Sequence, residues 1–158
     1  MTTSKFSVPI ADRWFEDYHA GEVFEFGPIA VEEAEVLSFA RRFDPQAIHI
    51  DPERAARGPY HGIIASGWHT LSLMMRLFVD NFLSGVATLA SPGVDEVRWR
   101  RPVRPGDRLT LRVSVTETRA SRSKPDRGIV LSLLEATNQN GELVSSLQAM
   151  NLMLKRSS

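Results

Sequence analysis

Cysteine is absent from this chain of 158 residues, which excludes a disulfide framework, a thiol nucleophile and a cysteine-ligated metal site. Neither charge sign is in excess, because 19 Lys and Arg residues balance 19 Asp and Glu residues. Proteins that bind nucleic acid or anionic membranes normally carry a basic surplus. The chain also begins without the apolar run of a signal peptide. We therefore expect a cytoplasmic protein with no nucleic-acid partner.

Long hydrophobic runs are also missing. The longest apolar stretch, Ile63–Leu83, is interrupted by several polar residues, among them Arg76 and Asp80. It is therefore not expected to span a membrane. The apolar content of 42% and the length predict one domain, residues 1–158, with a core of its own.

Two helical segments are predicted. In residues 31–43, four apolar side chains from Val36 to Phe43 fall at i, i+3, i+4 and i+7, which is one helix face. Pro45 disfavours the α conformation at the residue before it, so this helix should end there. The second segment is Ile63–Leu83, which is apolar on nearly every side and should therefore be buried on nearly every side.

A short helix is expected between these two segments. Asp51 is a good N-cap, Pro52 suits the first helical position, and Gly58 followed by Pro59 ends the helix.

The rest of the chain has the two-residue alternation of β-strands. A looser alternation at 22–26 predicts a short first strand, and Asn140-Gly141 predicts a hairpin turn. The later strands are expected around residues 97–100, 109–115, 129–133 and 142–154.

These elements predict an α+β fold. An antiparallel sheet of four or five strands can bury a helix that is apolar on all sides only by curling around it, which is the hot-dog arrangement. The predicted architecture is thus a single hot-dog domain, with a curled sheet wrapped around one long buried helix. Such a sheet leaves an unpaired edge and part of the helix uncovered, so a homodimer or a higher assembly of dimers is expected.

The segment 43–69 contains three of the four histidines. Within it, Asp44 and His49 lie five residues apart on a tight loop between two helix boundaries, a common way to place reactive side chains on a rigid frame. Alternatively, Asp44 only ends a helix and His49 is a hydrogen-bonded loop histidine. A metal site is not expected, because no two of these histidines have the i, i+4 spacing of a metal-binding helix.

The run from Asp44 to Pro52, DPQAIHIDP, resembles the hydratase signature of the MaoC-like dehydratases and (R)-specific enoyl-CoA hydratases. Residues 65–69 are similar to the start of the central helix in that family, and residues 101–107 to its strand-to-strand turn. The resemblance covers residues 23–154. It departs from the family at Gln46-Ala47, where Asn-Pro is frequent.

The resemblance implies a hydro-lyase that adds water to a 2-enoyl-CoA or removes it from a 3-hydroxyacyl-CoA. Coenzyme A is then part of the substrate, and no separate cofactor is implied. Asp44 and His49 share a water and handle its protons. A backbone N–H near Gly62, expected at the N-terminal end of the long helix, holds the enolate oxygen. The other expected substrate-binding residues are Gln46, Ser66 and His69. For the last two, simple packing is the alternative.

Two other functions stay open: a hot-dog thioesterase, and a non-catalytic acyl-CoA-binding module. Thioesterases of this fold usually carry their carboxylate within the helix or strand layer, and the long helix offers only Asp80, near its far end. The position of Asp44 and His49 before that helix therefore favours hydration.

Basic residues form two groups in this neutral chain. Guanidinium groups bind the phosphates of coenzyme A well, but charged residues also protect exposed strand edges. The first group consists of Arg98, Arg100, Arg101 and Arg104, and the second of Arg119, Arg122, Lys124 and Arg127.

Overall fold

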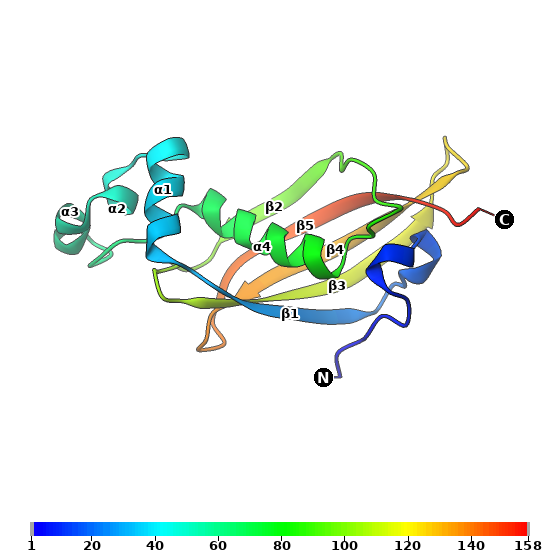
Figure 1. Cartoon of the computed structure of the whole chain (residues 1–158), viewed down its shortest axis with the longest axis horizontal. Helices are drawn as coiled ribbons and strands as arrows, with labels where there is room; N and C mark the ends of the chain where they lie inside the picture. Colours follow the sequence, from blue (N-terminus) through cyan, green and yellow to red (C-terminus); the bar gives the residue numbers. More distant parts are fainter. Residues whose placement is uncertain (1, 158) are drawn as a thin grey trace.

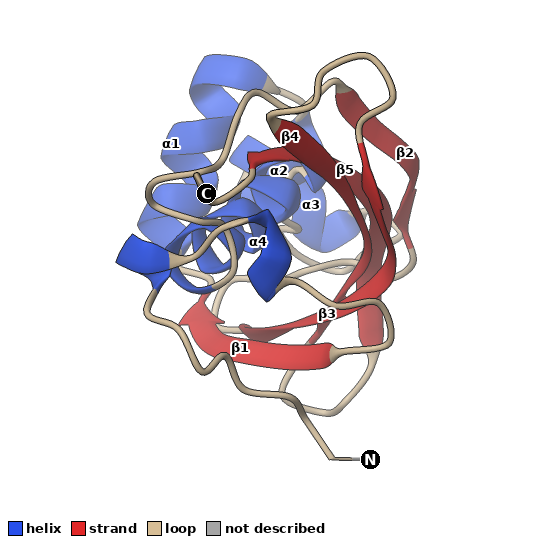
Figure 2. Cartoon of the chain, turned by 90° about the vertical axis from the view of Figure 1, so that its right-hand side faces the viewer, coloured by secondary structure: helices blue, strands red, loops and turns tan. Residues whose placement is uncertain are grey.

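The computed structural model describes residues 2–157. A five-stranded antiparallel sheet, in the order β1-β3-β4-β5-β2, curls around one long helix, α4 (Gly67–Asn81) (Figures 1 and 2). The predicted α+β hot-dog arrangement is confirmed. The strands are β1 (Val23–Ala30), β2 (Gly93–Trp99), β3 (Arg108–Ala120), β4 (Arg127–Thr137) and β5 (Leu143–Leu154).

Alternating side chains give the sheet its inner face. Along β4 every second residue is buried, from Gly128 to Ala136. The register places Val113 opposite Leu134, and Leu134 opposite Leu147, so apolar side chains of three strands meet under α4. All the predicted strands are present, and β3 and β4 are longer than the alternation alone indicates.

Helix α4 is not buried on every side within this chain. Met74 and Phe78 are at most 2% exposed, whereas Met75 and Val79, on the opposite face, are 49% and 45% exposed. The expectation of nearly complete burial is therefore not met by a single chain. Among the described residues, no helix is both long and apolar enough to cross a membrane.

The N-terminal arm packs over the far end of α4. Arg13 is only 5% exposed, and its guanidinium donates to the carbonyls of Asn81 and Phe82 over 2.9 and 3.0 Å. These are orphan carbonyls at a helix C-terminus, where a cation is favourable. Tyr18 donates to the same Phe82 carbonyl, and burial raises the pKa of its phenol to about 12.

Three short helices gather at the other end of the sheet, at the left of Figure 1: α1 (Glu33–Phe43), α2 (Ala47–Ile50) and α3 (Pro52–Arg57). As predicted, Asp51 caps α3, since its Oδ1 accepts from the N–H of Arg54 over 3.0 Å. Helix α2 replaces the irregular loop that the sequence predicted.

The predicted start of the long helix is wrong by four residues. Helix α4 begins at Gly67, not at Ile63, because the preceding backbone is bonded elsewhere. The N–H of Ile64 donates to the carbonyl of Ile48, and the N–H of Ala65 donates to that of Val103. These bonds hold residues 63–66 extended between the short helices and the sheet.

Candidate active site

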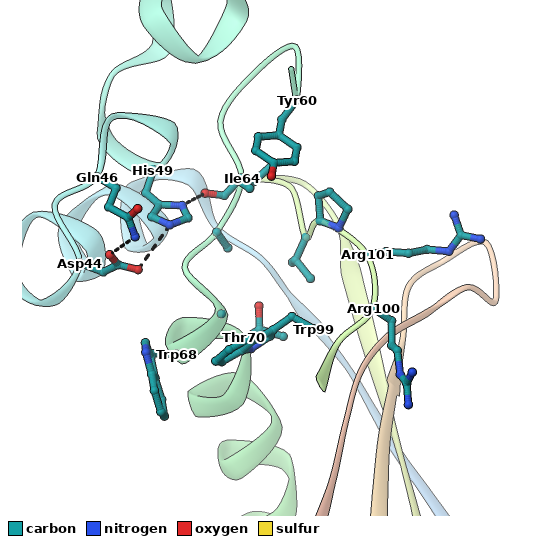
Figure 3. A pocket seen from close by; sticks show the side chains of 14 residues that line it. Asp44, Gln46, His49, Tyr60, Ile64, Trp68, Thr70, Trp99, Arg100 and Arg101 are labelled. Carbon is teal, nitrogen blue, oxygen red and sulfur yellow. Dashed lines mark hydrogen bonds and ion pairs between the residues drawn. The ribbon is translucent and has the colours of Figure 1, made fainter. Parts of the chain in front are cut away.

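Asp44 and His49 are brought together by two helix boundaries. Asp44 is the C-cap of α1, with its N–H bonded to the carbonyl of Ala40 over 2.8 Å. The chain then reverses, because the N–H of Gln46 donates to the Asp44 carbonyl over 2.8 Å. Helix α2 follows at once and turns the His49 ring back toward the Asp44 carboxylate (Figure 3).

The imidazole has a defined orientation. His49 Nδ1 lies 2.6 Å from the carbonyl oxygen of Ile64, and His49 Nε2 lies 3.3 Å from Asp44 Oδ2. A carbonyl can only accept, so Nδ1 carries a proton. Nε2 is then the nitrogen that can exchange a proton with a ligand. A neutral Nε2 and a carboxylate oxygen are both acceptors, and a water molecule between them can donate to both.

Asp44 is held in its charged form. Its Oδ1 accepts from Gln46 Nε2 over 2.7 Å, and its Oδ2 accepts from Ser66 Oγ over 2.7 Å. These bonds, that of Gln46 first, hold the pKa of the Asp44 carboxyl below its usual range, with a further contribution from His49; partial burial opposes the shift. The side chain is a carboxylate at neutral pH.

The pair faces a cavity of about 440 Å³ (Figure 3). One wall is the short-helix segment with Asp44 and His49, another is the first turn of α4, and a third is the end of β2 with the chain that follows it. The lining residues from the last two walls are Gly67, Trp68, Thr70, Trp99, Arg100, Arg101, Pro102 and Val103.

The N-terminus of α4 opens into this cavity. Gly67 lines it, and a Cβ at this position would lie 2.3 Å from Cε2 of the Trp99 ring. The absence of a side chain therefore lets Trp99 cover the first turn. Intrahelical bonding begins later, where the Thr70 N–H reaches the Ser66 carbonyl. The amides before Thr70 form the positive end of the helix, which favours an anionic oxygen.

Gly62 does not occupy the predicted place. It precedes the helix by five residues, and its N–H donates to the carbonyl of Ala55 over 3.1 Å. It is absent from the cavity wall. The expectation that Gly62 lies at the helix N-terminus is wrong, because residues 63–66 are extended, and Gly67 has that position instead.

The three other expected substrate-binding residues have different surroundings. Gln46 lines the cavity, whereas Ser66 is fully buried and reaches the cavity only through its bond to Asp44. His69 faces away, toward α1, where it stacks on Phe39 with 4.9 Å between ring centroids. Of these residues, the structure brings Gln46 and Ser66 to the carboxylate and places His69 elsewhere.

His69 is nevertheless an unusual residue. It is 1% exposed, and its Nε2 lies 3.6 Å from Glu35 Oε1. Burial lowers the pKa of His69, and the Glu35 carboxylate opposes that shift. A neutral, stacked ring at this position serves the packing of α1 against α4.

The sequence reasoning did not single out Gly67, Thr70, Tyr60 or Trp99 as site residues. Gly67 had a usable signal, since it follows Ser66 in the helix-start segment. Trp99 had none, because its strand alternation predicts only an outward or inward face.

Comparison with known proteins identifies the family of the chain. The family model of the MaoC-like domain matches residues 17–136. The uncharacterized protein YdeM of Bacillus subtilis is 32% identical over 124 residues, which is 78% of this chain and 86% of that protein. The 3-hydroxyacyl-thioester dehydratase Z of Mycobacterium tuberculosis is 40% identical over 83 residues, which is 51% of this chain and 55% of that protein.

A solved structure is similar over nearly the whole chain. The MaoC-like dehydratase from Rhodospirillum rubrum is 36% identical, with a TM-score of 0.84, and the match covers 92% of this chain and 99% of that one. The resemblance seen in the sequence is thus confirmed, and the chain belongs to the MaoC-like dehydratase family.

Proposed function

We propose that this protein adds water to a 2-enoyl thioester or, in the reverse direction, removes water from a 3-hydroxyacyl thioester. The observation that carries the proposal is the pairing of Asp44 Oδ2 and His49 Nε2 at 3.3 Å, in a cavity that also receives the N-terminus of α4. Hydration needs both features, a proton-transfer pair and a stabiliser of negative charge.

The proton transfer follows from the state of each group. Asp44, whose pKa is lowered, is a weak base that holds the water by accepting one hydrogen bond. His49 Nε2 accepts the proton as the water oxygen attacks C3 of the enoyl group, while Nδ1–H stays on the Ile64 carbonyl. The imidazolium then returns a proton to C2, which completes the addition with no proton gained or lost by the protein.

The enolate oxygen of the thioester requires a donor. We place it against the first N–H groups of α4, at Gly67 and Trp68, which line the same cavity as His49. The Trp99 ring lies against Gly67 and covers part of this end of the helix. Backbone donors aimed at developing charge in a covered site are among the largest contributions to catalysis.

The protein binds the substrate through its thioester carrier, and the proposed reaction requires no further cofactor. Within residues 2–157, no three His, Asp or Glu side chains lie close enough together to hold a metal ion.

A thioesterase remains the second candidate, because Asp44 could direct a water to the thioester carbonyl. Asp44 is the only acidic residue in the cavity wall among the residues that the structure describes. Asp80, the carboxylate within α4, instead pairs with Arg76 over 2.8 Å at the surface. A thioesterase would have no evident need for the fixed proton on His49 Nδ1, and this favours hydration.

The working unit in this proposal is a homodimer. The exposed face of α4 carries Trp68, Met75 and Val79, which are 60%, 49% and 45% exposed. Strand β2 is paired on one side only, with β5, and Val94 on it is 50% exposed. An apolar helix face beside an open sheet edge suits a second copy related by a two-fold axis.

The test is incubation with crotonyl-CoA, followed by both the enoyl absorbance and free thiol. Loss of absorbance without thiol supports hydration, thiol release supports a thioesterase, and neither signal leaves a binding module. Asp44→Asn and His49→Gln should each lower kcat about 100-fold or more. The double variant should lose much less than the product of the two, because the residues act as a unit. Near-normal rates in either folded single variant would remove the pair from the mechanism.

A further inference from the structure

The structure separates the two basic groups that the sequence contains. Arg100 and Arg101 line the cavity, on the side away from the catalytic pair (Figure 3). The second group, residues 119–127, forms the β3–β4 turn at the opposite end of the molecule from α1–α3 (Figure 1). There Arg127 binds Asp126 through two bonds of 2.8 and 3.0 Å. Only the first group is placed to meet a ligand in the cavity.

The backbone fixes where Arg100 and Arg101 emerge. Both follow the last residue of β2, and their N–H groups donate to the carbonyl of Val144 over 2.8 and 3.3 Å. The side chains project from this anchored point into solvent beside the cavity. The neighbouring Arg104 is committed elsewhere, because its guanidinium donates to the Tyr60 carbonyl over 2.6 Å. This bond holds Tyr60, another residue of the wall.

The charges here suit an anion. Arg101 Nη1 lies 3.7 Å from Glu142 Oε1, and both side chains are well exposed, at 60% and 42%. Such an exposed pair contributes little, so the guanidinium can exchange this partner for a ligand. The cavity wall carries two arginines and one carboxylate, and that carboxylate, Asp44, lies at the far side with its own donors.

We infer that Arg100 and Arg101 form a subsite for the phosphate of the thioester carrier. The inference rests on the proposed function, which fixes the thioester beside His49 and Gly67. The carrier arm then runs outward, past Tyr60 and Pro102, to the two guanidinium groups. Phosphate is the matching chemistry, since guanidinium forks bind its oxygens in pairs. Coenzyme A and the phosphopantetheine arm of an acyl carrier protein both supply such a phosphate.

The experiment compares carriers with one acyl group. Crotonyl-CoA, crotonyl-acyl carrier protein and crotonyl-N-acetylcysteamine, which has no phosphate, are hydrated by the wild-type protein and by the variant Arg100→Ala/Arg101→Ala. We expect a rise of about tenfold in KM for crotonyl-CoA, with kcat within about twofold, as for the loss of two exposed charged contacts. Kinetics with crotonyl-N-acetylcysteamine should not change. If KM rises equally for crotonyl-acyl carrier protein, the subsite binds the phosphate that both carriers share. If the kinetics with crotonyl-acyl carrier protein do not change, the subsite binds the nucleotide end of coenzyme A.

A matched control removes two charges at the other end of the sheet. The variant Arg119→Ala/Arg122→Ala should hydrate all three substrates like the wild type. Raising the ionic strength should increase KM for crotonyl-CoA in the wild type and in this control, but much less in the Arg100→Ala/Arg101→Ala variant. If the Arg100→Ala/Arg101→Ala variant showed an equal rise in KM for crotonyl-N-acetylcysteamine, the inference would be overturned. An unchanged KM for both phosphate carriers would overturn it as well.

A binding assay tests the phosphate subsite independently of the proposed hydration activity. Coenzyme A and pantetheine are titrated against the fluorescence of the wall residues Trp68 and Trp99. The wild type should bind coenzyme A about tenfold more tightly than pantetheine, and the Arg100→Ala/Arg101→Ala variant should lose that preference. This result would support the subsite even if no hydration occurred. Equal affinity of the wild type for the two ligands would refute it even in an active enzyme.

Discussion

Removing the hydroxyl of Ser66 tests how the pocket keeps Asp44 charged. Ser66 Oγ donates to Asp44 Oδ2 over 2.7 Å, and Ser66 itself is fully buried. In a Ser66→Ala variant the carboxylate loses this donor and keeps Gln46 on its other oxygen. The pKa of Asp44 should therefore rise toward the ordinary value for an aspartate.

The size of the change follows from the strength of the bond. A hydrogen bond to a charged group contributes about 1.5–3 kcal/mol, and one pKa unit corresponds to about 1.4 kcal/mol. Gln46 is the larger cause of the lowered pKa, and the Asp44 side chain is 18% exposed. The lower end of the range applies, so the charged carboxylate should lose about 1.5 kcal/mol of stabilisation.

The loss of this hydrogen bond should make stability depend less on pH. A carboxyl whose pKa is lowered by folding stabilises the fold above its unfolded pKa, and this contribution is lost as the pH falls through the folded pKa. The Ser66→Ala variant should be about 1.5 kcal/mol less stable than the wild type at pH 7, and the difference should shrink at acid pH. The carboxyl of Asp44 itself should also titrate at a higher pH in the variant than in the wild type.

The assay is an NMR titration of the aspartate carboxyl carbons, together with urea unfolding at neutral and acid pH. Ser72→Ala is the matched control, since Ser72 lies on the same helix, is exposed and donates to the Trp68 carbonyl. It should leave the titration of Asp44 in place. An unmoved titration of Asp44 in Ser66→Ala, with unchanged stability at neutral pH, would show that the hydroxyl does not help to hold Asp44 in its charged form.

Three further variants test other parts of the structure. In Gly67→Ala, the new Cβ meets the Trp99 ring, so kcat/KM should fall about tenfold or more in the crotonyl-CoA assay; normal turnover would contradict the thioester placement. Arg13→Met should lower the free energy of urea unfolding by about 3 kcal/mol, because buried carbonyls lose a charged donor. Activity per folded molecule should persist, and an unchanged unfolding midpoint would contradict the stabilising role of Arg13. Met75→Asp should turn the dimer into an inactive monomer in light scattering; an active wild-type monomer would refute the dimer.

The parts of the fold that could be predicted are those with a local period. Alternation marks each strand, and the i, i+3, i+4 pattern marks α1, because such patterns depend only on which face is buried. The start of α4 could not be predicted in this way. The amides of Ile64 and Ala65 are bonded to Ile48 and Val103, and such bonds leave no mark in the sequence around residue 63.

In the site, too, features with a local sequence pattern could be predicted and those set by distant contacts could not. Asp44 and His49 were found because they are close in sequence and flanked by helix-breaking residues. The orientation of His69 was not accessible, because a helix that is apolar on nearly all sides does not reveal which side faces the cavity. Arg13 was missed for a related reason. Its partners lie 68 and 69 residues away, at the end of α4, and its own segment has no period.

The departure from the family signature at Gln46-Ala47 is the remaining argument for a non-catalytic protein. The structure weakens that argument. Gln46 reaches back two residues and donates to Asp44 Oδ1 over 2.7 Å, so the longer amide supports the carboxylate itself. Ala47 starts α2, the turn that brings the His49 ring to Asp44. The Gln46-Ala47 pair therefore keeps a donor on the carboxylate and keeps the imidazole beside it. A silent binding module would have no use for a carboxylate held charged by two donors, the exposed Gln46 and the buried Ser66.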